Sequence, residues 1–285
     1  MNRADPGPLV DQLRANGFEV ESISPCAGGV VATAGIATLV GGQQVFAKTV
    51  PGSGGDLFEV EAEGLRALGC TPEVLAVTPD LLVLEAMRPR PDDHPGFWER
   101  LGHMMARLHT SNVYDRFGWH RDGWLGRMRQ ENAWATDGHA FFGEHRVLRW
   151  LREPLVEQAF DREERGALER LCDRLPELVP DSPPALTHGD LWCENVLADR
   201  AGDPVLIDPA VSYTWAEVDL SMLWCCPKPP AAQRFFEAYA EAAPLADGWR
   251  ERMPLLHLRE LLSIIAHGDD DWGAAGAVRE VVRSF

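Results

Sequence analysis

A short polar segment carries the residues most able to do chemistry. Residues 188–196 read HGDLWCENV, and Asp208 follows the apolar run 205–207 in VLIDPA. In this segment Asp190 precedes Asn195 by five residues. An acid, an amide and a second acid could together hold a divalent cation and deprotonate an alcohol. They could also be ordinary turn residues, because Asn and Asp are common in turns.

The spacing of these residues favours phosphoryl transfer to a hydroxyl group. That reaction needs positioning, neutralisation of phosphate charge by Mg²⁺, and a carboxylate that accepts the hydroxyl proton. A base Asp followed five residues later by a metal-binding Asn is the arrangement of the protein-kinase catalytic loop. We therefore predict that Asp190 is the catalytic base and that Asn195 and Asp208 are the Mg²⁺ ligands.

A phosphate clamp is expected nearer the N-terminus. Lys48, in VFAKTV, lies on a predicted strand, where kinases carry a lysine that contacts phosphates and pairs with a helical glutamate. A strand lysine can also be a simple edge residue. On the next predicted helix Glu61 precedes Leu65 by four residues and shares its apolar face, whereas Glu59 and Glu63 point away. We predict that Glu61 is the partner of Lys48.

Two further segments are candidates for binding the nucleotide, ATP. Gly28 and Gly29 would let backbone amides approach phosphates, although the segment departs from GxGxxG and a glycine pair can be a plain hairpin turn. Cys26 directly precedes them, so its oxidation could block nucleotide binding or cross-link two subunits, or it could be an unreactive loop cysteine. The segment LLVLEAM would supply main-chain contacts to adenine near Glu85 and Met87, or would be an ordinary core strand.

The elements that position these residues fall into two parts. Residues 18–50 predict consecutive antiparallel strands joined by glycine turns, 56–69 a helix, and 73–87 two more strands. After residue 97 the apolar spacing becomes helical, except for one β-rich island at 186–208. We expect an α+β, bilobal fold. Residues 1–87 form a nucleotide-binding lobe, a small antiparallel sheet carrying one helix, and residues 88–285 form a larger, mainly helical lobe with the catalytic loop and the substrate pocket.

Composition limits the partners. The net charge is −17 and the pI is about 4.9, which disfavours nonspecific binding to nucleic acid or to an anionic membrane surface. The N-terminal sequence MNRADPGPLV lacks the apolar core of a secretory signal, so we expect a cytoplasmic protein. The six cysteines include no CxxC pair, which indicates reduced thiols rather than a disulfide framework.

Several longer segments add a resemblance to a known family. They are HGDLWCEN at 188–195, LIDPAVSYTWAEVDLSML at 206–223, FGWHRDGWLGRMRQENAW at 117–134, FFGEHRVLRWL at 141–151 and the tail at 234–258. With them the chain resembles the fructosamine-3-kinase (ketosamine kinase) family, within the aminoglycoside phosphotransferase and protein-kinase-like superfamily. The pair Cys193–Glu194 departs from the Ser-Gly expected in that family.

The resemblance implies a kinase-like fold and a specific reaction. Members of this family use ATP and Mg²⁺ to phosphorylate the 3-hydroxyl of a ketose attached to an amine. The product then decomposes and releases the amine, which is deglycation. By position, Asp190 is the base, Asn195 and Asp208 bind the metal, and Lys48 with Glu61 forms the clamp. The expected partner is a small ketosamine or glycated amine, and the protein could be a monomer or a homodimer.

The same resemblance assigns supporting and substrate-contacting residues. Asp219, in EVDLSML, would brace the catalytic loop through His188. Trp192 follows the expected base by two residues and would line the sugar pocket, although a tryptophan is often a core residue. Further pocket candidates are His120, Arg121 and Trp134.

Other functions remain open at this point. The acceptor could be another small alcohol, such as an aminoglycoside or a choline-like compound, and the chain could be a nucleotide-binding pseudokinase. A metal-dependent hydrolase built on His188, Asp190 and Asp208 would leave Lys48 and Glu61 unexplained, and would need more metal ligands than this cluster supplies.

Overall fold

The computed structural model describes residues 7–26, 32–50, 52 and 55–285. The chain forms two compact units. The first unit comprises Met1–Pro91 together with Asn195–Pro209, and the second comprises Asp92–Glu194 and Ala210–Phe285. In the part of the chain that the structure describes, no helix is both long and apolar enough to cross a membrane.

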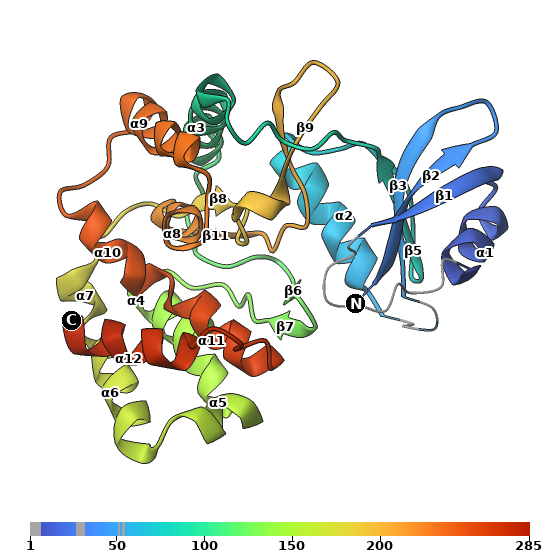
Figure 1. The fold of residues 1–285 in the computed structure, drawn as a ribbon. Coiled ribbons are helices and arrows are strands. Elements are labelled where there is room, and N and C mark those ends of the chain that lie inside the picture. Colours follow the sequence, from blue (N-terminus) through green and yellow to red (C-terminus); the bar gives the residue numbers. More distant parts are fainter. Residues whose placement is uncertain (1–6, 27–31, 51, 53–54) are drawn as a thin grey trace. The chain divides into compact units, whose positions relative to one another are not determined.

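The first unit is built on a five-stranded antiparallel sheet in the order β1-β2-β3-β5-β4 (Figure 1). Its strands are β1 (Val20–Cys26), β2 (Thr33–Leu39), β3 (Gln44–Thr49), β4 (Val74–Thr78) and β5 (Leu81–Glu85). The strands alternate their side chains between the two faces of the sheet, because successive residues of a strand point to opposite sides. On the central strand β3, Lys48 pairs with Leu82 of β5, so the lysine lies in the middle of the sheet.

Two helices cover the sheet of the first unit, one on each face (Figure 1). Helix α2 (Leu57–Leu68) packs Phe58 and Leu65 against Leu82 and Leu84 and ends at Gly69, which has a left-handed backbone. Helix α1 (Gly7–Ala15) packs against the other face. The prediction of a single helix in this lobe is therefore wrong.

The sequence signal for α1 is weak. Only Leu9 and Leu13, four residues apart, mark its buried face, and both side chains are completely inaccessible to solvent. They pack against Val45, Ala47 and neighbouring residues of the sheet. Two leucines in a nine-residue segment do not distinguish a helix from a loop, so the sheet face that they cover is what defines this helix.

A short hairpin distant in sequence also belongs to the first unit. Its strands are β9 (Val196–Ala198) and β10 (Pro204–Leu206). The Arg88 amide donates to the Ala198 carbonyl (2.8 Å), and the Leu206 amide donates to the Cys70 carbonyl (2.9 Å). These bonds explain why this hairpin groups with residues before 91. The hairpin carries one candidate metal ligand before its first strand and the other after its second.

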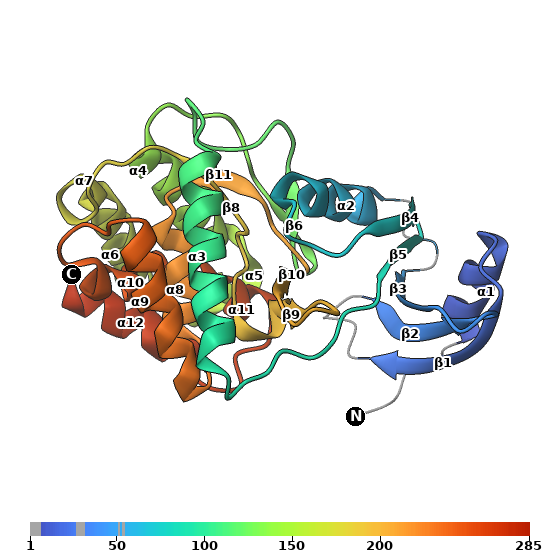
Figure 2. The ribbon, with the colours of Figure 1, turned by 90° about the horizontal axis from the view of Figure 1, so that it is seen from above.

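The second unit is mainly helical (Figure 2). Helices α3 (Pro95–Ser111) and α9 (Gln233–Ala242) lie side by side. The other helices are α4 (Gly138–Phe141), α5 (Pro154–Ala159), α6 (Arg162–Asp173), α7 (Leu175–Leu178), α8 (Glu217–Cys225), α10 (Trp249–Leu256), α11 (Leu258–His267) and α12 (Ala274–Ser284). Short 3₁₀ turns lie at Cys193–Asn195, where the sequence passes from the second unit to the first, and at Pro230–Ala232.

Residues 142–159 form three short helical pieces rather than one continuous helix. A π-helical turn (Phe142–Val147) and a 3₁₀ turn (Leu148–Arg152) precede α5. The break falls at Glu153, which is extended (φ −78°, ψ 133°) because it precedes Pro154. Four short strands complete the unit: β6 (Gly123–Leu125) pairs with β7 (Met128–Gln130), and β8 (Ala185–Thr187) pairs with β11 (Ser212–Thr214).

Candidate active site

The first unit gathers a buried cluster of one cation and two carboxylates. Lys48 Nζ lies 2.7 Å from Glu61 Oε2 and 2.6 Å from Asp208 Oδ1. Lys48 comes from the centre of the sheet, Glu61 from the face of α2 that packs on it, and Asp208 from the end of the β9–β10 hairpin. The ion pair between Lys48 and Glu61 is thus the one that their sequence spacing predicts.

The electrostatics of this cluster follow from burial and from an excess of negative charge. Burial alone would lower the pKa of Lys48, but Asp208 and Glu61 overcome that effect and raise it. Burial raises the pKa of Glu61 to about 8, although Lys48 opposes the shift. Among the described residues, the second oxygen of Glu61, Oε1, is buried without a hydrogen-bond partner. One ammonium therefore serves two carboxylates, and the cluster can accept a further cation or donor.

Asn195 and Asp208 are held next to each other by the backbone. The Ile207 amide donates to the Asn195 carbonyl (3.0 Å), and Asp208 is the next residue. Asp208 is also the one non-glycine residue with a positive φ, 54°, in the described ranges. Such conformations cost of order 1–3 kcal/mol and concentrate at functional sites. The strained turn holds the Asp208 carboxylate toward Lys48 rather than along the strand direction.

These two side chains fit a magnesium ion. Asn195 is buried, whereas the Asp208 side chain is 38% exposed, so the Asp208 carboxylate is the more accessible of the two. Mg²⁺ takes hard oxygen ligands and usually only one or two from protein carboxylates. In the described residues no group of three or more His, Cys, Asp or Glu side chains is placed to hold a metal.

An apolar cavity of the first unit adjoins this cluster. The cavity is lined by Asp208, by Glu85 and by Met87. The rest of its lining is Ile36, Phe46, Pro72, Leu84, Leu197 and Ile207. The Glu85 amide already donates to the Glu73 carbonyl (2.9 Å). The structure thus brings the two predicted adenine-contacting residues to the same cavity as Asp208.

The remaining predicted nucleotide residues lie at the edge of the described chain. Gly28 and Gly29 fall outside the described residues. Cys26 ends β1 and is exposed, and its thiol is not in a disulfide. The other five cysteines are also free.

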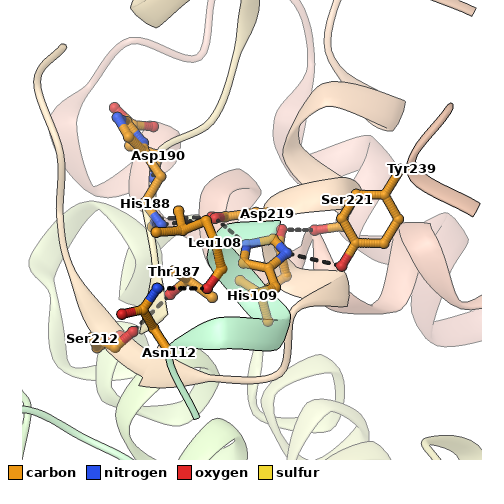
Figure 3. Close-up of polar contacts among 12 residues, drawn as sticks. Leu108, His109, Asn112, Thr187, His188, Asp190, Ser212, Asp219, Ser221 and Tyr239 are labelled. Atoms are coloured by element: carbon orange, nitrogen blue, oxygen red, sulfur yellow. Dashed lines mark hydrogen bonds and ion pairs between the residues drawn. The ribbon is translucent and has the colours of Figure 1, made fainter. Parts of the chain in front are cut away.

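In the second unit, Asp219 binds the backbone of the loop at residues 188–190, called here the HGD loop (Figure 3). The amides of His188 and Gly189 donate to the two carboxylate oxygens of Asp219, at 2.7 and 2.8 Å. His109 Nε2 donates to the same carboxylate (3.1 Å). Burial acts to raise the pKa of Asp219, but interactions with His109, with His188 and with the Gly189 amide lower it. Asp219 therefore remains ionised and acts on the loop backbone directly.

Gly189 is required by the geometry of the loop. Its φ is 79°, and a Cβ atom there would lie 2.1 Å from the Ala210 carbonyl oxygen. The Ala210 amide in turn donates to the His188 carbonyl (2.9 Å), and Arg259 donates to the Gly189 carbonyl. Every residue other than glycine would displace this backbone.

Two functional neighbours of Asp219 were not predicted from the sequence. His109 receives a hydrogen bond at Nδ1 from the Tyr239 hydroxyl (2.9 Å), so Tyr239, His109 and Asp219 form a buried chain (Figure 3). The sequence contains one indication that His109 is buried. It follows Leu101 and Met105 at intervals of four residues, which places it on the buried face of α3. A histidine on an apolar stripe indicates a buried partner, but the sequence does not say which one.

Asp190 and Trp192 follow the anchored backbone. The Asp190 amide donates to His188 Nδ1 (3.2 Å), which fixes the imidazole, and the Trp192 amide donates to the Asp190 carbonyl (3.1 Å). Trp192 is 38% exposed and lines a cavity of the second unit.

The other predicted pocket residues lie elsewhere in the second unit. The His120 ring packs at an angle against Trp119, and Trp134 belongs to an aromatic group with Tyr114 and Tyr213. The Arg121 carbonyl accepts a bond from the Asn132 side chain. None of His120, Arg121 and Trp134 lines the cavity to which Trp192 contributes.

This fold and these residues define a kinase-like phosphotransferase. A model of the fructosamine kinase family matches residues 7–274, so the chain belongs to that family. A probable ketoamine kinase of Synechocystis sp. is 30% identical over 268 residues, with 89% of this chain and 87% of that protein covered. The chloroplastic protein-ribulosamine 3-kinase of Arabidopsis thaliana is 28% identical over 232 residues, covering 76% and 69%.

Solved structures agree with this assignment. A crystal structure assigned to the fructosamine-3-kinases, from Thermobifida fusca, matches with a TM-score of 0.82 at 30% identity, covering 98% of this chain and 100% of that one. An aminoglycoside phosphotransferase shares the fold, with a TM-score of 0.66 at 16% identity and coverages of 98% and 99%. The protein is therefore a phosphotransferase with the α+β, bilobal kinase-like fold that the sequence predicts.

Proposed function

We propose that this protein transfers the γ-phosphoryl group of ATP, with Mg²⁺, to the 3-hydroxyl of a ketosamine. The phosphorylated product would then decompose and release its amine, which makes the reaction a deglycation. The observation that carries the proposal is the buried cluster of Lys48, Glu61 and Asp208, because a catalytic kinase needs a lysine held in this way to contact the phosphates.

The first unit supplies the groups that bind the nucleotide. Lys48, held by Glu61, contacts the phosphates, and Asn195 and Asp208 hold Mg²⁺, which neutralises charge on the transferred group. Since the Glu85 amide is already bonded, we assign the Glu85 carbonyl and the Met87 amide to adenine.

The second unit supplies the base and the acceptor contacts. Asp190 accepts the proton of the acceptor hydroxyl while the hydroxyl oxygen bonds to the γ-phosphorus of ATP. The bond between the γ-phosphorus and the oxygen that bridges it to the β-phosphorus breaks, and ADP leaves. Asp219 positions the loop that carries Asp190. Trp192 contacts the sugar, and His120, Arg121 and Trp134 are proposed as more distant acceptor contacts.

The proposal is tested by replacing the base and varying the acceptor. Asp190→Asn should lower turnover of N-fructosyl-lysine and N-ribulosyl-lysine by about 10²–10⁴-fold, because the amide cannot accept the hydroxyl proton. Binding of a non-hydrolysable ATP analogue, measured by calorimetry, should be unchanged. Phosphorus NMR of the product would identify the phosphorylated hydroxyl.

Two acceptors serve as controls for the alternative functions. Turnover of an aminoglycoside or of choline, with none of either ketosamine, would contradict the proposed substrate class. No turnover of any acceptor despite ATP binding would indicate a pseudokinase. Retained turnover in Asp190→Asn would show that Asp190 is not the base.

A further inference from the structure

The cavity lined by Trp192 has features that the transfer reaction itself does not use. It has a volume of about 920 Å³, within the range of pockets that take drug-sized ligands and larger than a single sugar needs. Its walls are largely apolar and include two exposed tryptophans, Trp192 and Trp272. The lining also contains Glu260 and His257. A ketose attached to an amine would therefore leave space for the amine substituent.

Two polar atoms of this lining are buried and unsatisfied. Among the described residues, Glu260 Oε2 and His257 Nδ1 have no hydrogen-bond partner. An unpaired buried polar atom is destabilising, and natural structures keep few of them. Because both atoms belong to residues that line the cavity, a ligand with a hydrogen-bond donor would remove the cost at Glu260.

The charges around the cavity leave Glu260 without a close cation from this lining. The ammonium of Lys228, which also lines the cavity, donates to the Trp224 carbonyl. Arg259, next to Glu260 in sequence, is occupied by the Gly189 carbonyl and Gln130. Burial lowers the pKa of His257 to about 4, so that side chain is neutral. Burial also raises the pKa of Glu260, although the charges of Arg259 and His267 oppose the shift.

The cavity lies within electrostatic reach of the proposed base. Cys226 lines it, and the pKa of its thiol is raised to about 12, first by burial and then by the negative charges of Glu260 and Asp190. Trp192, also in the lining, is hydrogen-bonded to Asp190 through the backbone. A ligand in the cavity therefore lies beside the loop that carries Asp190, with Glu260 in the same lining.

We propose that Glu260 binds the protonated amine of the acceptor, with Trp192 and Trp272 as aromatic walls, so that the enzyme selects cationic ketosamines. This inference rests on the proposed function and deepens it. A cation gains at this site from the carboxylate and from the faces of the aromatic rings. A neutral ketose derivative would leave Glu260 Oε2 unsatisfied, and a site built to pair with a polar group rejects the ligand that lacks it.

The test compares two acceptors that differ in one charge. N-Fructosyl-propylamine carries a protonated amine at neutral pH, and its N-acetylated form carries a neutral amide. Glu260→Gln should raise the KM of the amine by about tenfold to a hundredfold, the loss of a hydrogen bond to a charged group. Its kcat should change less than about twofold, since binding is lost equally in the ground and transition states. The KM of the amide should not change.

A matched variant and a direct measurement complete the test. Glu280→Gln makes the same change at an exposed carboxylate of the same unit that lies outside this lining and should change both KM values less than about twofold. Calorimetric titration of the amine into the enzyme should show the same weakening in Glu260→Gln as the KM does. If that variant does not fold, the wild-type enzyme still decides the matter, because it should favour the amine over the amide.

Equal KM values for amine and amide in the wild type, or an unchanged KM for the amine in Glu260→Gln, would overturn the inference while leaving ketosamine phosphorylation intact. Failure of the wild type to phosphorylate either compound while it binds the amine in a Glu260-dependent manner would contradict the proposed function and not the cation site.

Discussion

The two units hold their functional groups in different ways. In the first unit, charged side chains contact one another: Lys48 lies between Glu61 and Asp208 at 2.7 and 2.6 Å. In the second unit, Asp219 accepts hydrogen bonds from the main chain of the HGD loop, at His188 and Gly189. One arrangement sets the positions of charges, and the other sets the path of the backbone.

This difference predicts how each region responds to substitution. When one charge of a side-chain cluster is removed, the remaining carboxylates can take up a proton, so the substitution should affect activity more than stability. A backbone held by a buried carboxylate has no such alternative, because its amides would be left unpaired. Changes in the second unit should therefore lower stability and activity together.

The largest effect is expected at Gly189. Gly189→Ala places a Cβ atom 2.1 Å from the Ala210 carbonyl oxygen at a residue whose φ is 79°. The loop must move, and we expect a loss of about 5 kcal/mol or more in the free energy of unfolding, together with a loss of turnover. The control is Gly202→Ala in the β9–β10 turn, where φ is 89° but the added Cβ atom would meet no neighbouring atom within 4 Å. It should cost only about 1 kcal/mol. Equal losses in urea titrations of the two variants would show that the close contact is not what constrains the loop.

A slightly smaller effect is expected at Asp219. In Asp219→Asn an amide group replaces a carboxylate that accepts bonds from two main-chain amides and from His109, so at least one donor loses its acceptor. We expect a loss of about 3–5 kcal/mol in the free energy of unfolding, as for other broken buried pairs. The exposed Asp181→Asn should change it by less than about 0.5 kcal/mol. A stable Asp219→Asn protein with normal turnover would contradict the bracing role.

His257 should make the second unit sensitive to acid. Burial lowers the pKa of His257 to about 4, from an ordinary value of 6.5. Between these values the unfolded chain binds more protons than the folded chain, so stability is complete above pH 6.5 and falls as the pH drops toward 4. The loss should reach about 3 kcal/mol. His257→Gln should flatten the dependence of the unfolding midpoint on pH between 6.5 and 4, and an unchanged slope would show that another group is responsible.

The sequence predicted the parts of the site that depend on local spacing. The helical period selected Glu61 over Glu59 and Glu63, because a helix places residues four apart on one face. The strand run before Asp208 likewise placed that residue at the end of β10. Both predictions used only neighbours within one element, which is where sequence periodicity carries information.

The sequence did not predict contacts that depend on packing between elements. The chain from Tyr239 through His109 to Asp219 joins three helices, and no local pattern pairs their polar residues. Helix α1 is defined by the sheet face that it covers. Glu260 was likewise not predicted from the sequence, because its burial and its unsatisfied oxygen follow from the surrounding cavity and not from the segment RELL.

The smallest effect on stability is expected at Lys48, with a large effect on turnover. Lys48→Met removes the cation from between Glu61 and Asp208, and the buried carboxylates can respond by taking up a proton. We expect a loss of only about 1–2 kcal/mol in the free energy of unfolding, but a fall in turnover of at least about 100-fold, because the phosphates lose a charged contact. Lys48→Arg keeps the charge and should retain stability, yet lose turnover because the guanidinium has a different shape. Urea titration beside steady-state kinetics would measure both quantities. If Lys48→Met lost as much stability as Asp219→Asn, the two units would not differ in the way that their contacts indicate.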